Sequence, residues 1–436
     1  MTEIKGNNRI DRNIPPPVVD TPVVQLPTLR KHTLPNGITM LVYDRCNEPV
    51  NYLSVVSRGG QAEAQSAAVA VLTSVMQREG SQLHSGEDIA ATMDFNGSWL
   101  RGVSHSHHMQ QSMYSLNTRF HKVLPVFADL LFHPAFPQSV MEVRREALAK
   151  NLEVSAEDVS YVAKCHADKM IMGHNHPLAN VDTPQQVRNL SVGDLTGFHS
   201  RYCTPENSVI YLCGHITPQI EELVAETFGS QPLSGTGVQI QPAPFSPMAA
   251  DTSITHHPGA LQSAVIMNIP AIPRTHPHYI PLHITVSALG GYFGSRLMQS
   301  IREEKGLTYG IDASLVGYID GAHIQISAET DNRHVYTLID EVRNEMRRLA
   351  TDPCRGDELT RLRRSLSSSL ASVTDSPFST IDYHITMLLS GIPCDYFRQR
   401  QQAIASITPD TIAEMASLYL NPDNLRIAVV GDSSKM

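Results

Sequence analysis

The middle and the end of the chain repeat one pattern. Residues 190–214 read LSVGDLTGFHSRYCTPENSVIYLCG, and residues 407–431 read ITPDTIAEMASLYLNPDNLRIAVVG. The two segments align without a gap at an offset of 217 residues, about half of the 436-residue chain. Self-similarity at one fixed offset indicates a duplicated structural unit. We therefore expect two copies of one domain of about 200 residues.

Each copy carries the same local signals. Ser191 and Thr408 are candidate helix N-caps, each followed three residues on by Asp or Thr. The amphipathic helix that follows leads through a Pro-acid-Asn turn into a strand of aliphatic residues. Upstream, residues 142–170 pair with residues 361–388 at an offset near 219. The similarity therefore extends beyond a single short motif.

The order of elements indicates the fold class. Residues 32–44, HTLPNGITMLVYD, place an Asn-Gly turn before an alternating strand, which predicts a hairpin-like start. Strands followed by helices favour an α+β fold over a doubly wound parallel sheet. Two such domains on a flexible joint commonly enclose a binding cleft. We expect four segments: an extended, poorly packed leader at 1–28, an N-terminal domain at 29–230, a Gly/Pro/Ser-rich linker at 231–250 and a C-terminal domain at 251–436.

Composition narrows the compartment and the partners. The first residues contain no apolar run typical of a secretory signal, and no segment approaches 18 unbroken apolar residues. The six cysteines form no C-x-x-C pair, which favours free thiols in a reducing cytoplasm. The net charge of -9 suggests neither a nucleic acid nor an anionic membrane as partner. We therefore expect a cytoplasmic protein.

The chain has 20 histidines, which raises the question of a metal site. No two of them are four residues apart, so neither His-Glu-x-x-His nor His-x-x-Glu-His can occur. Residues 103–114 alternate like a single strand, on which His105 and His107 would share a face next to His108. A polar strand face is the favoured interpretation, and a metal site there stays open.

Residues 289–310, LGGYFGSRLMQSIREEKGLTYG, are the densest motif in the chain. Ser295 is a candidate N-cap of a short helix that stops at Gly306, before a strand. A phosphate-binding loop is one interpretation of the glycine-rich turn, and a helix-packing turn is the one that composition favours. No nucleophile with a neighbouring base is evident. The turn contains Gly290, Gly291 and Gly294.

Together these segments resemble the pitrilysin/insulinase/mitochondrial processing peptidase family of inverted-zinc metallopeptidases, over about residues 30–432. The resemblance rests on LPNGITMLV near the front, on residues 176–216 and above all on residues 289–310. It implies two homologous α+β domains, each a mainly antiparallel sheet packed with helices. The two domains would form half of a clamshell chamber.

The family carries His-x-x-Glu-His on a helix of its first domain, and a third ligand, a Glu, further along the chain. Aligning residues 62–81 with that helix places the two His at Val71 and Val75 and the general-base Glu at Ser74. The third ligand falls at Asn151. Valine cannot bind a cation, and serine cannot act as a carboxylate base at neutral pH. The resemblance therefore implies that this chain has no zinc or other cofactor and no peptidase activity alone.

The family's second domain supplies an Arg and a Tyr that reach the substrate, and these match Arg302 and Tyr309. Such donors can stabilise a developing oxyanion. The resemblance implies a non-catalytic subunit that binds unfolded peptide and forms a heterodimer with a homologous His-x-x-Glu-His subunit, which holds the zinc. The turn at Gly290–Gly294 would form part of a peptide-guiding wall. The alternative is a non-proteolytic scaffold or peptide-binding homodimer, and the substrate and its fate stay open.

Overall fold

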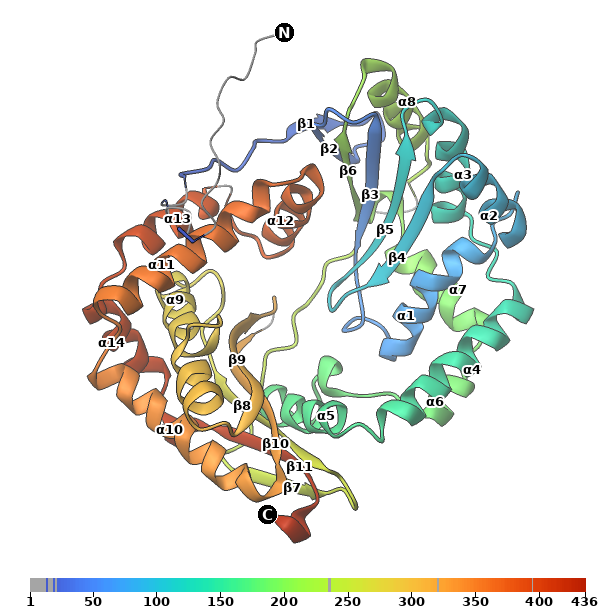
Figure 1. Cartoon of the computed structure of the whole chain (residues 1–436). Helices are drawn as coiled ribbons and strands as arrows, with labels where there is room; N and C mark the ends of the chain where they lie inside the picture. The colour runs from blue at the N-terminus through green and yellow to red at the C-terminus, as the bar shows by residue number, and fades with distance from the viewer. Residues whose placement is uncertain (1–12, 15–18, 20–21, 234–236, 320, 394) are drawn as a thin grey trace.

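The computed structural model describes most of the chain. Pro15–Pro17 of the expected leader, residues 234–236 of the expected linker and Cys394 lie outside the described residues. The described chain forms two halves, each a sheet packed with helices, which face each other in Figure 1. This confirms the predicted α+β fold. The described residues are 13–14, 19, 22–233, 237–319, 321–393 and 395–436.

In the described chain, the first sheet has six strands in the order β1-β2-β6-β3-β5-β4. β2 and β6 are parallel, and the other neighbouring pairs are antiparallel. Gly37, with φ +89°, lies in the turn between β1 and β2, which confirms the predicted hairpin. The strands are β1 (Arg30–Thr33), β2 (Thr39–Asp44), β3 (Val50–Arg58), β4 (Trp99–Ser104), β5 (His108–Leu116) and β6 (Ser208–Gly214).

The second sheet, again counted over the described residues, has five strands in the order β7-β11-β8-β10-β9. β7 and β11 are parallel, and the other pairs are antiparallel. This order matches β2-β6-β3-β5-β4 strand for strand, so the duplication predicted from sequence is confirmed. The strands are β7 (Thr252–His256), β8 (Gln262–Pro270), β9 (Thr308–Gly317), β10 (Ala322–Asp331) and β11 (Arg426–Gly431).

The helices before β6 and β11 also correspond. α7 (Val192–Tyr202) and α14 (Pro409–Tyr419) have equal length and begin 217 residues apart. Ser191 Oγ and Thr408 Oγ1 each accept a hydrogen bond from the backbone N–H three residues on, at 3.3 and 3.2 Å. Both predicted N-caps are therefore confirmed, because each satisfies a backbone donor that the helix leaves unpaired.

Helices of each half cover one face of that half's own sheet. α2, α3 and α8 pack against the first sheet, and α9, α10, α11 and α14 pack against the second. The remaining helices of the first half are α1 (Ala67–Met76), α2 (Gly86–Phe95), α3 (Phe120–Phe132), α4 (Gln138–Ser155), α6 (Pro184–Arg188) and α8 (Pro218–Gly229). Those of the second half include α9 (Tyr279–Gly290), α10 (Val335–Thr351), α11 (Gly356–Ala371) and α13 (Tyr396–Ser406).

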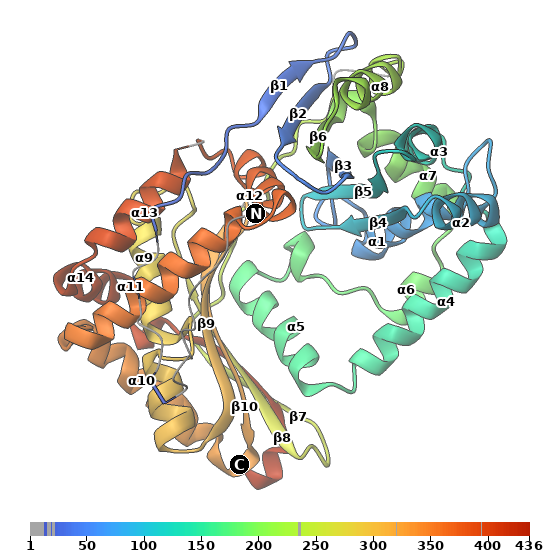
Figure 2. The same cartoon turned by 45° about the horizontal axis from the view of Figure 1, so that its top comes forward.

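Two further helices are exchanged between the halves. α5 (Val159–Met172) packs Ala163 and Ala167 on β8 and β11 of the second sheet. α12 (Pro377–Leu389) packs Ile381 and Ile385 on β3 and β6 of the first sheet. Figures 1 and 2 show each helix on the sheet of the opposite half. α5 and α12 lie in the segments that the repeat pairs, so each copy lends the same helix to the other.

Because of this exchange, the two halves are joined by packed helices as well as by the linker. The described part of residues 231–250 contains no helix or strand, and it runs beside α5. The N–H of Ser246 donates a hydrogen bond to Met172 O of α5 at 2.9 Å, and the N–H of Met248 donates one to Met170 O at 2.9 Å. The expected leader also makes contacts, because Val24 and Leu26 pack against the core of the second half. The domain limits themselves stay a prediction.

Candidate functional site

The glycine-rich motif connects α9 to β9 through an unusual helix. A short α-helix was predicted here, but Met298–Glu304 forms a π-helix. The N–H of Leu307 reaches Ile301 O at 3.0 Å and that of Lys305 reaches Ser300 O at 3.2 Å. The wider turns are typical of π-helices, which are frequent at functional sites. Gly306, with φ +62°, ends the helix as predicted.

Ser295 does not cap this helix. Its hydroxyl is buried and has no hydrogen-bond partner among the described residues. The neighbouring Arg296 instead anchors the segment, because its guanidinium makes a two-point contact with Glu358 of α11 at 2.8 and 3.2 Å. Arg296 is 8% exposed, so this pair fixes the start of the helix from inside the protein.

The three glycines of the turn differ in their surroundings. A Cβ on Gly290 would lie 2.5 Å from the Cβ of Ala313 on β9, so this glycine permits close packing of α9 on the sheet. A Cβ on Gly291 would approach Ser287 Cα to 2.7 Å, and one on Gly294 would approach the Tyr292 ring. These contacts give the glycines a packing role. Their role in guiding a peptide stays a prediction.

Arg302 and Tyr309 lie together at the end of this motif. The guanidinium carbon of Arg302 is 5.5 Å from the Tyr309 ring centroid and 4.9 Å from that of Phe293. Arg302 also forms an ion pair with Glu303 at 3.1 Å. Tyr309 is 91% exposed and Phe293 is 63% exposed. The geometry presents a guanidinium between two rings, with one phenol directed into solvent.

A cavity of about 600 Å³ lies beside Tyr309, between α5 and strands β8 to β10. Its walls include Lys164, Asp312 and Glu329. Lys164 Nζ forms an ion pair with Asp168 at 2.6 Å, and the Ser160 hydroxyl donates a hydrogen bond to Glu329. Burial raises the pKa of Asp312. The exchanged helix α5 therefore forms one wall of the space next to the predicted site.

The positions matched to the family's zinc site lie on α1. Val71 and Val75 are half-buried, one turn apart on one face of the helix. The Ser74 hydroxyl donates to Val71 O at 2.7 Å, and Ser74 O accepts a hydrogen bond from Gln111 at 2.9 Å. Apolar side chains and a hydroxyl engaged with its own helix do not fit a zinc ion.

Asn151, the fourth of these positions, is exposed on α4. Leu148 and Leu152 of the same helix pack against the core that contains α1. The two helices expected to carry the ligand positions thus pack together, and the assignment of those positions stays a prediction. Among the described residues, no group of three or more His, Cys, Asp and Glu side chains could hold a metal ion.

The histidine segment is a hairpin and not the single strand that alternation predicted. β4 ends at Ser104 and β5 begins at His108. The turn forms because the backbone N–H groups of Gln61 and Ala62 donate to the carbonyls of His105 and Ser106, both at 2.9 Å. Backbone hydrogen bonds to a segment distant in sequence therefore accompany a turn that the local alternation of side chains did not predict.

The hairpin also changes which histidines meet. His105 stacks on His108, with ring centroids 4.2 Å apart and an interplanar angle of 11°, whereas His107 pairs with Glu63 at 2.9 Å. Burial lowers the pKa of His105, and burial together with the neighbouring imidazoles lowers the pKa of His108 to about 3. The stacked pair is therefore neutral near pH 7.

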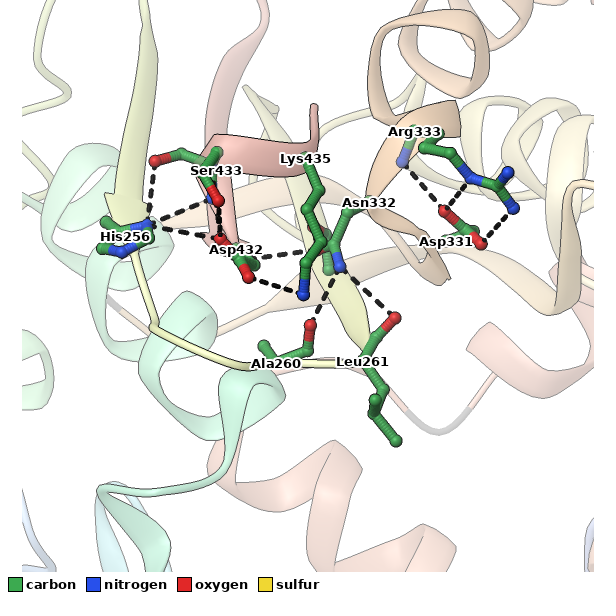
Figure 3. Close-up of polar contacts among 11 residues, drawn as sticks. His256, Ala260, Leu261, Asp331, Asn332, Arg333, Asp432, Ser433 and Lys435 are labelled. Atoms are coloured by element: carbon green, nitrogen blue, oxygen red, sulfur yellow. Dashed lines mark hydrogen bonds and ion pairs between the residues drawn. The ribbon is translucent and has the colours of Figure 1, made fainter.

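A serine, a histidine and an aspartate meet near the end of the chain, as Figure 3 shows. The N–H and hydroxyl of Ser433 both contact His256 Nδ1, at 3.2 and 2.9 Å, and Asp432 lies 3.9 Å from the same nitrogen. A catalytic triad needs the serine and the carboxylate on opposite ring nitrogens. This cluster therefore fastens the chain end and does not form a nucleophile.

The roles of Arg302 and Tyr309 stay a prediction. Phe293 was not predicted, although an aromatic residue in a glycine-rich turn is a signal that the sequence offers. Glu358, which lies 62 residues from its partner Arg296, was not predicted either. The five described cysteines are free. None of the described helices has the length and apolar character needed to cross a membrane.

The chain is similar in sequence to several known proteins. Residues 189–366 match the family described as the peptidase M16 inactive domain. The uncharacterized zinc protease YmxG of Bacillus subtilis is 20% identical over 348 residues, which cover 78% of this chain and 83% of that protein. The chloroplastic stromal processing peptidase of Arabidopsis thaliana is 24% identical over 270 residues, 55% of this chain and 20% of that protein.

Solved structures show the same fold. A peptidase M16 inactive domain from Pseudomonas fluorescens superposes with a TM-score of 0.85 at 20% identity, covering 92% of this chain and 98% of that one. A protease from Helicobacter pylori gives a TM-score of 0.83 at 16% identity, covering 93% of this chain and 100% of that one. Residues 189–366 of this chain therefore match the domain type described as the peptidase M16 inactive domain, and the chain shares the fold of these solved structures.

Proposed function

We propose that this chain is the non-catalytic, substrate-binding subunit of a zinc metallopeptidase and that it pairs with a homologous His-x-x-Glu-His subunit. The partner holds the zinc and the general base, and this chain contributes Arg302 and Tyr309. The contrast between the two halves carries the proposal. The first half has Val71 and Val75 where ligands are needed, and the second keeps an exposed Tyr309 beside Arg302.

The chemistry of the pair supports this role. The guanidinium of Arg302 presents several N–H donors, and the phenol of Tyr309 adds an O–H donor. Both can bind the oxygen of a peptide carbonyl as it gains negative charge. Loss of one such donor costs about a hundredfold to a thousandfold in rate in other enzymes. The exposure of Tyr309 allows it to reach a substrate held on another chain.

The surroundings of the pair suit an unfolded peptide. β9, which carries Tyr309, is the last strand of its sheet in the described chain. The cavity of about 600 Å³ beside it is lined by apolar side chains together with the charged residues Lys164, Asp312 and Glu329. Extended peptides bind through backbone hydrogen bonds with side chains in adjacent cavities. A peptide side chain can therefore enter this cavity while its carbonyl meets Arg302 and Tyr309.

The proposal is tested by reconstitution with a His-x-x-Glu-His chain from the same genome. We expect light scattering to show a 1:1 complex of the two chains. The mixture should cleave unfolded peptides, whereas each chain by itself should not. Arg347→Ala, at an exposed position of α10, is the control that should leave cleavage unchanged. A chain that forms a homodimer, binds peptides and never supports cleavage would instead be the scaffold or peptide-binding protein of the alternative.

A further inference from the structure

A second cavity, of about 610 Å³, lies between the two halves, where the β4–β5 hairpin faces α12. Arg101 of β4 and Tyr114 of β5 line it from the first half. Arg274, together with Asp382 and Leu389 of α12, lines it from the second. No residue of the Arg302–Tyr309 pair contributes to it. A ligand in this cavity would touch both halves of the chain at once.

The walls of this cavity carry a positive charge. Among the described lining residues, Arg101 and Arg274 contribute two guanidinium groups and Asp382 contributes one carboxylate. The imidazoles of His105 and His108 are neutral near pH 7, because burial lowers the pKa of both. The whole chain has a net charge of -9, so a positive cavity is a local departure from the rest of the protein. This charge favours an anionic ligand.

Both guanidinium groups are available to that ligand. Among the described residues, no carboxylate forms an ion pair with Arg101 or Arg274. Arg101 is exposed, and the guanidinium carbon of the half-buried Arg274 lies 5.7 Å from the ring centroid of Tyr279. Two guanidinium groups of this kind are suited to bind a carboxylate, because each presents paired N–H donors.

The wall next to the arginines is held in place by distant segments. Glu63 accepts a hydrogen bond from Gly60 N at 2.7 Å and contacts His107 Nδ1 at 2.9 Å, which fixes the hairpin turn. A Cβ on Gly60 would lie 2.2 Å from His105 O, so only glycine allows this close approach. The binding surface is thus formed before a ligand arrives, which lowers the entropy cost of binding.

The rest of the lining is mixed, with polar side chains such as Gln110 and Ser112 beside a group of apolar and aromatic ones. The rings of Tyr52 and Tyr114 lie 4.5 Å apart, and Ile385 and Leu389 of α12 pack near them. A small inorganic anion makes no use of such a surface. A ligand with a carboxylate next to an apolar side chain uses both parts of the cavity. β4 is the last strand of its sheet in the described chain and offers backbone groups to an extended peptide.

We propose that this cavity binds the C-terminal residue of a peptide, with its carboxylate on Arg101 and Arg274 and its apolar side chain against Tyr52 and Tyr114. The inference rests on the proposed peptide-binding function and adds a site that holds a peptide end without cleaving it. The bound end would lie between the β4–β5 hairpin and α12. Peptides with a free C-terminus are thereby distinguished from internal segments of a longer chain.

The test is calorimetric titration of the isolated chain with an N-acetylated hexapeptide ending in Leu, as the free acid and as the C-terminal amide. We expect the acid to bind on the order of tenfold more tightly, because the amide lacks the charge that the guanidinium groups bind. Arg101→Gln and Arg274→Gln should each reduce this preference and leave binding of the amide unchanged. Arg347→Gln, on the surface of α10, should retain the full preference.

Equal affinity for the acid and the amide would overturn the proposal, as would a preference that survives both cavity variants. An amidated peptide with an internal Asp that binds as tightly as the free acid would assign the cavity to acidic side chains and overturn the C-terminal assignment. The assay needs neither partner nor zinc. Its failure would therefore leave cleavage by the reconstituted complex, and with it the role of Arg302 and Tyr309, unaffected.

Discussion

The guanidinium of Arg302 lies over the ring of Tyr309, with 5.5 Å between the guanidinium carbon and the ring centroid. The two residues are seven positions apart, and the π-helical segment ends between them at Glu304, two residues before Gly306. The positive φ of Gly306 turns the chain from the helix into β9, which brings the two side chains together. The local fold therefore places two hydrogen-bond donors side by side, and we expect their removal to affect the same reaction step.

Tyr309→Phe should lower the turnover number of the reconstituted peptidase by about a hundredfold, because it removes one donor to the developing oxyanion. The Michaelis constant should change little, since the ring and its contact with Arg302 remain. Steady-state kinetics on one unfolded peptide measure both constants. Tyr336→Phe, at a half-exposed tyrosine of α10, is the matched control and should leave both unchanged. A higher Michaelis constant with an unchanged turnover number would mean that Tyr309 acts in binding the substrate and not in the reaction step.

Restoring the family's ligands should restore a metal site. Val71 and Val75 are one turn apart on α1, about 5–6 Å between neighbouring Cβ atoms, which is the spacing of helical zinc ligands. The combined variant Val71→His, Ser74→Glu, Val75→His and Asn151→Glu should purify with zinc by elemental analysis, and the native chain should not. The same variant without Val75→His should lose the metal. A folded combined variant that binds no zinc would contradict the alignment of these positions.

The exchanged helices should make the two halves unfold together. Ile381 of α12 is fully buried against the first sheet, so Ile381→Ala should lower the free energy of unfolding by about 2–5 kcal/mol. Val143→Ala, at a 68% exposed position of α4, should change it by less than about 0.5 kcal/mol. Urea titration followed by circular dichroism should show one shifted transition. Two separate transitions, with one unaffected, would argue against the coupling.

Stability should fall in mild acid. His323 on β10 is 1% exposed, and burial lowers its pKa to about 4. The unfolded chain binds this proton near pH 6.5, so it gains protons first as the pH falls. The free energy of unfolding should therefore decrease from about pH 6.5 to about pH 4 and be flat above that range. His323→Leu should flatten part of this slope in urea titrations. An unchanged slope would mean that His323 has the same pKa in the folded and unfolded states.

The sequence predicted the repeated architecture because its signals are local. Each copy has its own N-cap, turn and strand, and Ser191 and Thr408 cap their helices as expected. The exchange of α5 and α12 could not be predicted in this way. Their apolar faces indicate burial, but a helix pattern does not specify which of two similar sheets it will cover.

The candidate site could be predicted only where its residues lie close together in the sequence. Arg302 and Tyr309 come from one segment, so their proximity follows from that segment's own fold. The cavity between the halves combines Arg101, Arg274 and Asp382, which lie far apart in sequence. The histidine hairpin was missed because residues 59–62 pair with it and impose a turn on an alternating pattern. Long-range backbone pairing leaves no local signal.

The central claim is that one active site is divided between two chains. Its most direct measurement is the turnover of the reconstituted complex with the double variant Arg302→Ala and Tyr309→Phe. We predict a 1:1 complex that keeps the partner's zinc and cleaves peptides at a rate lowered by about a hundredfold or more. Native turnover by that complex would show that these residues take no part in the reaction and would contradict the account.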